Sequence, residues 1–169
     1  MLSYAGMRSL MALTFVALTL GTVACGSSPT APGPSGGIGA PTGAASASEA
    51  DLTFCVTEAN QYRASIGKAP LTRSSTLEAY AATGAHDDGL AHTGHGHFHT
   101  APGVARAENE IPWWAHLASV HEVMQQGLAQ MWAEGPGGGH YENLRGPYTE
   151  VGCGVFRSGS EITVVQDFR

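Results

Sequence analysis

The stretch VGCGVFRSGSEITVVQDF (residues 151–168) decides the architecture of the chain. Residues 151–156 and 162–168 are rich in β-branched and aromatic side chains, and the polar segment RSGSE (157–161) separates them. Two such runs joined by a short glycine-containing segment are typical of two antiparallel strands and their turn. The sequence therefore predicts a β-hairpin at its C-terminal end.

Upstream of the hairpin, apolar residues recur at helical spacing in three segments. The first predicted helix covers residues 52–66, with Asp51 as its N-cap and Gly67 just beyond its end. The second begins at the sequence STLE (75–78), which fits a capping box. The third runs from about His116 to Glu134. Three helices followed by a hairpin predict an α+β layered domain.

The N-terminal residues 1–24 are typical of a signal peptide for export. Arg8 is the only charge before the apolar run Leu10–Leu20, which is too short for a membrane-spanning helix of roughly 20 residues. Cys25 follows small residues and resembles the lipid-accepting cysteine of a bacterial lipobox, although Thr22 stands where leucine is usual. We predict lipidation at Cys25, with an ordinary secretion signal as the alternative.

Residues 25–50 consist almost entirely of Gly, Ser, Ala, Pro and Thr. Such a segment cannot bury enough apolar surface to offset the entropy of ordering its backbone. We therefore predict a flexible tether that precedes a folded domain over residues 51–169. If Cys25 carries a lipid, the domain is held at the outer surface of a membrane in the cell envelope; otherwise the protein is secreted.

Charge and motif content exclude several classes of function. Eight Lys and Arg against fourteen Asp and Glu give a net charge of −6, so we expect no nucleic-acid binding. The glycine-rich run 135–139 lacks the Lys-Ser/Thr of a phosphate loop. His121-Glu122 begins a zincin motif, but Gln125 stands where its second histidine would be. The sequence also has no Gly-x-Ser-x-Gly nucleophile elbow.

Histidines are concentrated in one part of the chain, with five of the eight between positions 86 and 99. In HTGHGHFH (92–99) they alternate with other residues. If this segment is extended, His95, His97 and His99 point to one face and can gather a transition metal. The alternative is a solvated polar loop.

A series of short motifs follows one order along residues 52–169. The series contains Asn60-x-x-Arg63, the histidine segment, Glu108-Asn109, Trp132-x-Glu134, HYEN (140–143) and VGCG (151–154). In this order the motifs resemble the CAP superfamily, also called SCP domains: cysteine-rich secretory proteins, antigen 5 and pathogenesis-related 1. The resemblance implies a three-layer α-β-α sandwich with a small antiparallel sheet that ends in the C-terminal hairpin.

The resemblance also implies a central cleft in which two histidines and two acidic residues meet, and in some members bind zinc or another divalent cation. The implied metal ligands are His97, Glu108, Glu134 and His140, with His95 and His99 as alternatives for the first histidine. Two carboxylates beside two neutral imidazoles give a net charge of −2, which is costly unless a cation or protons compensate it. The alternative is that the four residues only hydrogen-bond one another.

The sequence departs from the family pattern in four places. Ala107 replaces the glycine before Glu108, and Asn143 replaces the glutamine of the His-Tyr-x-Gln signature. Ala59 stands where a histidine is usual, and the spacing from Trp132 to Glu134 is one residue short. The last departure bears most directly on the assignment of Glu134 as a ligand.

Cys55 and Cys153 remain once Cys25 is assigned to a lipid or removed with the signal peptide. An oxidising compartment permits a disulfide between them, which would tie the first helix to the first hairpin strand. The alternative is a pair of buried free thiols.

These features together predict an extracellular binding module whose His/Glu cleft holds a divalent metal, such as zinc, and a small apolar or peptide ligand. A metal-dependent hydrolase acting in the same cleft is the second hypothesis. The third is an envelope or adhesion protein in which the cleft is vestigial. We favour a binding module over an enzyme, because fold alone is weak support for catalysis.

Overall fold

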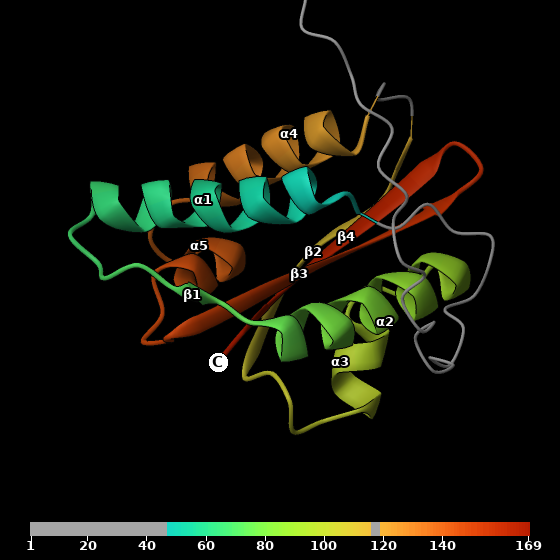
Figure 1. Cartoon of the computed structure of the whole chain (residues 1–169), viewed down its shortest axis with the longest axis horizontal. Coiled ribbons are helices and arrows are strands. Elements are labelled where there is room, and N and C mark those ends of the chain that lie inside the picture. The colour runs from blue at the N-terminus through green and yellow to red at the C-terminus, as the bar shows by residue number, and fades with distance from the viewer. Residues whose placement is uncertain (1–46, 116–118) are drawn as a thin grey trace, which may run out of the picture. The chain divides into compact units, whose positions relative to one another are not determined.

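The computed structural model describes residues 47–115 and 119–169 (Figure 1). The predicted signal peptide, Cys25, nearly all of the predicted tether and the first residues of the third predicted helix lie outside the described residues. Among the residues that are described, no helix combines the length and the apolar character needed to span a membrane.

Helices and strands alternate along the chain. Their order is α1 (Glu49–Ser65), β1 (Thr72–Arg73), α2 (Ser75–Ala91), α3 (Gly96–Thr100), β2 (Ala107–Ala115), α4 (Val120–Ala133), α5 (Gly139–Leu144), β3 (Glu150–Ser158) and β4 (Glu161–Phe168). The three long helices and the C-terminal hairpin that the sequence predicts are therefore confirmed. The short elements β1, α3 and α5 and the long strand β2 are additional.

The four strands form one sheet in the order β1-β3-β4-β2. β3 pairs with β4 as an antiparallel hairpin, and β2 pairs antiparallel with the other side of β4. The two-residue β1 adds a short parallel pairing to β3, so the sheet is mixed. In Figure 1, α1, α4 and α5 cover one face of the sheet, and α2 and α3 lie against the other. This arrangement is the predicted three-layer α-β-α sandwich, with β2 at one edge of the sheet.

The N-terminal capping of α1 and α2 differs from the sequence prediction, although α2 begins at Ser75 as predicted. α1 begins earlier than predicted, because Ser48 is the N-cap and Asp51 is the third helical residue that completes a capping box with it. At α2 the predicted capping box does not form: Ser74 is the N-cap without a side-chain hydrogen bond, and Glu78 pairs with Arg73 instead. The interpretation of Asp51 as N-cap and of residues 75–78 as a capping box was therefore wrong.

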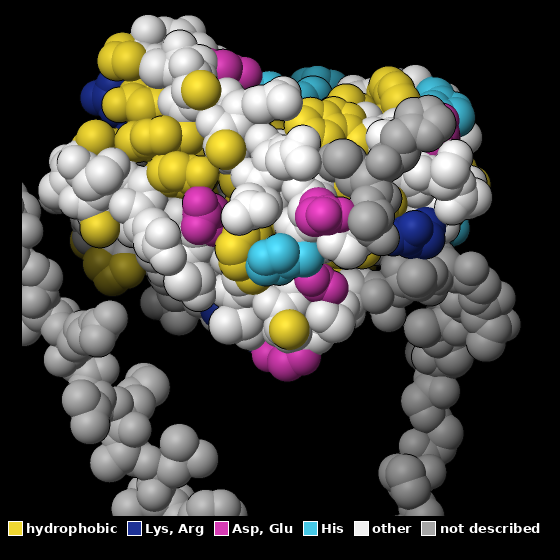
Figure 2. All heavy atoms as spheres, turned by 90° about the horizontal axis from the view of Figure 1, so that it is seen from above, with side chains coloured by type: hydrophobic (Ala, Val, Ile, Leu, Met, Phe, Trp, Pro, Cys, Tyr) yellow, Lys and Arg dark blue, Asp and Glu magenta, His cyan; other side chains and the backbone are white. Residues whose placement is uncertain are grey.

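The main hydrophobic core lies between the sheet and helices α1, α4 and α5. The strands contribute Val151, Cys153, Val155, Ile162, Val164 and Phe168. The helices contribute Cys55, Ala59, Val123, Met124, Leu128, Met131 and Leu144. Figure 2 views this side of the molecule and shows that some hydrophobic side chains also reach its surface. Burial of this many apolar side chains is the main stabilising contribution to such a fold.

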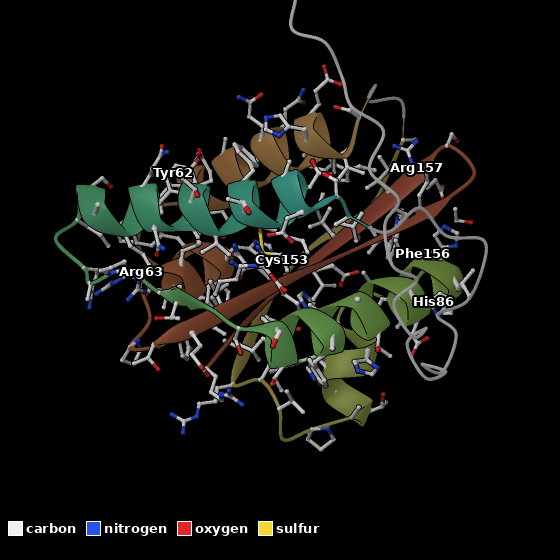
Figure 3. All side chains as sticks on the ribbon, viewed as in Figure 1. Tyr62, Arg63, His86, Cys153, Phe156 and Arg157 are labelled. Atoms are coloured by element: carbon white, nitrogen blue, oxygen red, sulfur yellow. A yellow bond between two sulfur atoms is a disulfide. The ribbon has the colours of Figure 1, made fainter. Side chains whose placement is uncertain are left out.

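A disulfide between Cys55 and Cys153 crosses this core from α1 to β3 (Figure 3). The two cysteines are 98 residues apart in the sequence. The predicted disulfide is confirmed, and the alternative of two free thiols is wrong. Disulfides are typical of proteins that fold outside the reducing cytosol.

The Asn-x-x-Arg motif of α1 has a structural role. The Asn60 side chain exchanges two hydrogen bonds with the backbone of Leu71, at 2.7 and 3.0 Å. The buried Arg63 guanidinium donates to backbone carbonyls of Ala69, Leu144 and Gly146 at 2.8–2.9 Å. These bonds fix the segment that follows α1 and the end of α5, and neither side chain belongs to the cleft described below.

Candidate functional site

The candidate site lies along the edge strand β2, where elements from both layers of helices meet. His95 comes from the turn between α2 and α3, and Glu108 comes from β2. Glu134 directly follows α4, and His140 lies in the first turn of α5. The His95 and His140 rings have centroids 6.5 Å apart. Three of the four ligands implied by the sequence, together with the alternative His95, thus lie along this edge of the sheet. They line two hollows: His95 and Glu108 line one, and Glu134 and His140 line the other.

His95 is the histidine that lies against Glu108. Its Nδ1 is 2.8 Å from Glu108 Oε1, and its backbone N–H donates to Glu110 Oε2 at 2.6 Å. The residue has a φ of +59°, a left-handed conformation that is uncommon for a side chain other than glycine. The hydrogen bond to Glu108 is the main cause that raises the pKa of His95. The local backbone therefore presents both the ring and the amide of His95 to strand β2.

His97, the first choice from the sequence, contacts Tyr80 and Asp87 and does not pair with Glu108. Its ring packs on Tyr80 with centroids 4.8 Å apart, and its Nδ1 is 3.4 Å from Asp87 Oδ2. His99 is exposed, and its ring centroid is 6.4 Å from that of His95. Residues 96–100 form the short helix α3, so the extended conformation that would align His95, His97 and His99 on one face does not occur.

The second histidine and the second acid form a pair of their own. His140 Nδ1 lies 2.5 Å from Glu134 Oε1, and the backbone N–H of His140 donates to Glu134 Oε2 at 3.1 Å. The glycine-rich turn between α4 and α5 makes this pairing possible, since Gly135 and Gly137 adopt positive φ angles of 67° and 95°. Both oxygens of Glu134 are therefore engaged by one residue.

Two asparagines connect the edge strand to α5. Asn143 Nδ2 donates to the backbone carbonyl of Glu108 at 2.9 Å and to Asn109 Oδ1 at 3.0 Å. Asn109 Nδ2 in turn donates to the carbonyl of His140 at 3.3 Å. Asn143, at the position where the family signature has glutamine, thus ties α5 to the backbone of β2 at Glu108.

Three buried carboxylates beside Glu108 were missed by the sequence analysis. Asp88 on α2, Glu110 on β2 and Asp167 on β4 are all 4 % exposed or less. Burial raises the pKa of Glu110 to about 7. Burial, followed by the charges of Glu108 and Asp88, raises the pKa of Asp167 to about 8. The signal that could have revealed Glu110 is its spacing of two from Glu108, which places both on one face of a strand.

Two hollows adjoin the site. One, of about 200 Å³, has apolar walls from Ile111, Pro112, Trp114 and Met131, and it reaches Glu134 and His140. The other, of about 330 Å³, is lined by His95, Phe98, His99, Arg106, Glu108 and Tyr148. The first can accept a small apolar group, and the second offers cationic and aromatic side chains.

The donor atoms of the site suit a divalent cation. His95, Glu108 and Glu110 each offer one ligand atom, and these atoms lie within 4.8 Å of one another. Glu108 Oε2 and Glu110 Oε1 are buried and have no hydrogen-bond partner. Imidazole nitrogen and carboxylate oxygen are ordinary zinc ligands, so the residues present fit such an ion.

The domain is an α-β-α sandwich with histidines and carboxylates gathered along its edge strand, which is the arrangement expected for a CAP domain. The profile of the CAP family, described as "Cysteine-rich secretory protein family", matches residues 56–168. The chain therefore belongs to the CAP family.

The chain is also similar to a solved structure, that of an outer surface protein from Borrelia burgdorferi. The two share 18% sequence identity with a TM-score of 0.49, and the similarity covers 72% of this chain and 93% of that chain. No curated protein matches the chain.

Proposed function

We propose that this chain is an exported CAP-domain protein that acts as a binding module outside the cell. Its cleft along β2 holds a divalent cation, and the adjoining 200 Å³ hollow takes a small apolar or peptide ligand. The observation that carries the proposal is the convergence of His95 with two buried glutamates whose oxygens Glu108 Oε2 and Glu110 Oε1 lack partners.

The charge of the cleft supports a bound cation. Glu108 and Glu110 have side chains that are only 1% exposed, and His95 is the sole cationic partner of either within the described residues. Buried carboxylate oxygens without partners are costly to a folded protein, because they lose their water without gaining a hydrogen bond. A divalent cation would satisfy these oxygens and would leave coordination positions open for a ligand from outside.

The experiment is a zinc titration by isothermal calorimetry on the exported protein beside two double variants. His95→Ala/Glu108→Gln removes the pair in the cleft. His92→Ala/Glu161→Gln removes a matched pair, 2.8 Å apart, that lies on the surface away from the cleft. We expect micromolar or tighter binding by the wild type and the surface variant, and at least a tenfold loss in the cleft variant. Equal binding by all three proteins would assign zinc to the other histidines and contradict the proposal.

The lipid anchor is a separate part of the proposal. The disulfide and the family agree with export, and the proposal assigns the anchor to Cys25. Detergent phase partition of the full chain expressed in a bacterium that processes lipoproteins tests this. We expect the wild type in the detergent phase and Cys25→Ser in the aqueous phase. Aqueous partition of both would mean that the protein is secreted without an anchor.

A further inference from the structure

Strand β2 presents two glutamates to the same turn. Because strand side chains alternate, Glu108 and Glu110 share a face, and the turn that ends in His95 passes over them. The His95 ring contacts Glu108 at 2.8 Å, and its backbone N–H contacts Glu110 at 2.6 Å. One oxygen of each glutamate is thus used to fix its position.

The other oxygen of each glutamate is left without a partner. Glu108 Oε2 and Glu110 Oε1 are both buried and unpaired, although most buried polar atoms in proteins have a hydrogen-bond partner. Among the described residues, no lysine or arginine forms an ion pair with either glutamate. A carboxylate that is held by one oxygen and unpaired at the other has the arrangement of a metal ligand supported by a second hydrogen bond.

The Glu134–His140 pair lacks this property. Glu134 accepts a hydrogen bond at each oxygen from His140, as described above, and neither oxygen is among the buried unpaired atoms. Both side chains are about one third exposed. Recruiting both members of this pair to the ion would require breaking a 2.5 Å contact, whereas one ligand atom from each of His95, Glu108 and Glu110 already lies within 4.8 Å of the others.

We propose that Glu110 is a metal ligand, and that the cation of this cleft is held by an inner triad of His95, Glu108 and Glu110. The Glu134–His140 pair then lies outside the coordination sphere, beside the open positions of the ion. One nitrogen and two oxygen donors suit a zinc-like divalent cation, and two carboxylates match its charge. This inference rests on the proposed metal binding and specifies which residues perform it.

The first experiment compares three single variants of the exported protein by zinc calorimetry. Glu110→Gln keeps the size of the side chain and the acceptor for the His95 amide, and we expect it to weaken zinc binding at least 100-fold. Glu134→Gln should weaken binding less than about threefold. The matched control is Asp88→Asn. Asp88 is also buried, with one oxygen bound by the His97 amide and the other unpaired, but it does not belong to the group of ligand atoms within 4.8 Å of one another. It too should change affinity less than about threefold.

The second experiment needs no variant and covers the case in which Glu110→Gln does not fold. X-ray absorption of the zinc-loaded wild type counts imidazole ligands, and the inner triad predicts one. Two imidazoles, or a large loss in Glu134→Gln with none in Glu110→Gln, would overturn the inner triad and move the ion toward His140. A wild type that binds no zinc would overturn the proposed function itself, so the two failures are distinguishable.

Discussion

The two faces of the sheet are built from the same strands but differ in chemistry. Toward α1, α4 and α5, β3 and β4 present the apolar side chains of the main core together with Cys153. Toward α2, β3 presents Gly152 and Gly154, and the second apolar cluster is only Ala81, Ala85, Phe156 and Val165. The alternation of side chains along a strand allows one strand to serve both faces.

Carboxylates gather on the side of the sheet that faces α2. We call this side the carboxylate face, and the side that faces α1, α4 and α5 the apolar face. Glu108 on β2 lies directly across from Asp167 on β4, and Asp88 approaches from α2. The oxygens of Asp167, one oxygen of Asp88 and one of Glu108 have no hydrogen-bond partner. The difference between the faces indicates that burial on the apolar face supplies most of the free energy of folding, which offsets the cost of burying carboxylates on the other face.

Removing the disulfide should have the largest effect, because it weakens the apolar face. A crosslink between residues 98 positions apart restricts the unfolded chain by about 4–5 kcal/mol in the chain-entropy model. We expect the melting temperature to fall sharply in reductant, measured by circular dichroism. In a Cys55→Ala/Cys153→Ala variant, reductant should cause no further change. An unchanged melting curve of the wild type in reductant would show that the disulfide contributes little.

The next effect concerns the close packing of α2 on the sheet. A Cβ added at Gly154 would lie 2.1 Å from a backbone atom of Ala81, so the helix has to move. We expect Gly154→Ala to cost about 1–3 kcal/mol or more, and to weaken zinc binding as well because α2 leads into His95. The matched control is Gly139→Ala, where the added Cβ meets nothing within 4 Å. Equal melting temperatures of the two variants would contradict this account of the α2 face.

Much of the apolar face could be predicted from sequence, because its signals are local. Helical spacing in α1, α2 and α4 and the β-branched runs of the hairpin depend on residues near one another in the chain. The family resemblance then gave Glu108, Glu134 and His140 at motif positions. The disulfide is not a local signal, but it was predicted because Cys55 and Cys153 are the two cysteines that remain once Cys25 is assigned to a lipid or removed with the signal peptide.

The carboxylate face could not be predicted in this way, since it depends on contacts between distant segments. Asp88, Glu110 and Asp167 carry no motif, and their burial follows from strand pairing and from the packing of α2. The choice among His95, His97 and His99 depended on a left-handed residue and a five-residue helix, which spacing alone does not specify. The sequence therefore predicted residue types for the site, and the fold showed that His95 is the histidine that lies against Glu108 and that Glu110 lies beside them.

The last prediction concerns the free energy of unfolding. It asks whether burying the Asp167 carboxylate on the carboxylate face makes the folded protein less stable. Asp167 is fully buried, and its pKa is raised to about 8 by burial and then by Glu108 and Asp88. In the unfolded chain the same group loses its proton near pH 4. The folded state therefore binds more protons between about pH 4 and pH 8, and its free energy of unfolding falls as the pH rises through that range.

Asp167→Asn removes this dependence, because an amide of the same shape does not ionise. With chelator present, we expect the variant to match the wild type near pH 4 and to be more stable than the wild type at pH 8, with a higher melting temperature and a gap that grows between these two pH values. Glu110, with its pKa raised to about 7, leaves a residual slope in both proteins, so the difference between them isolates Asp167. Asp87→Asn, at an exposed aspartate of the same helical layer, should show no such growing gap. A variant less stable than the wild type at pH 8 would mean that the Asp167 carboxylate stabilises the fold, and the division between a stabilising face and a costly one would then be wrong.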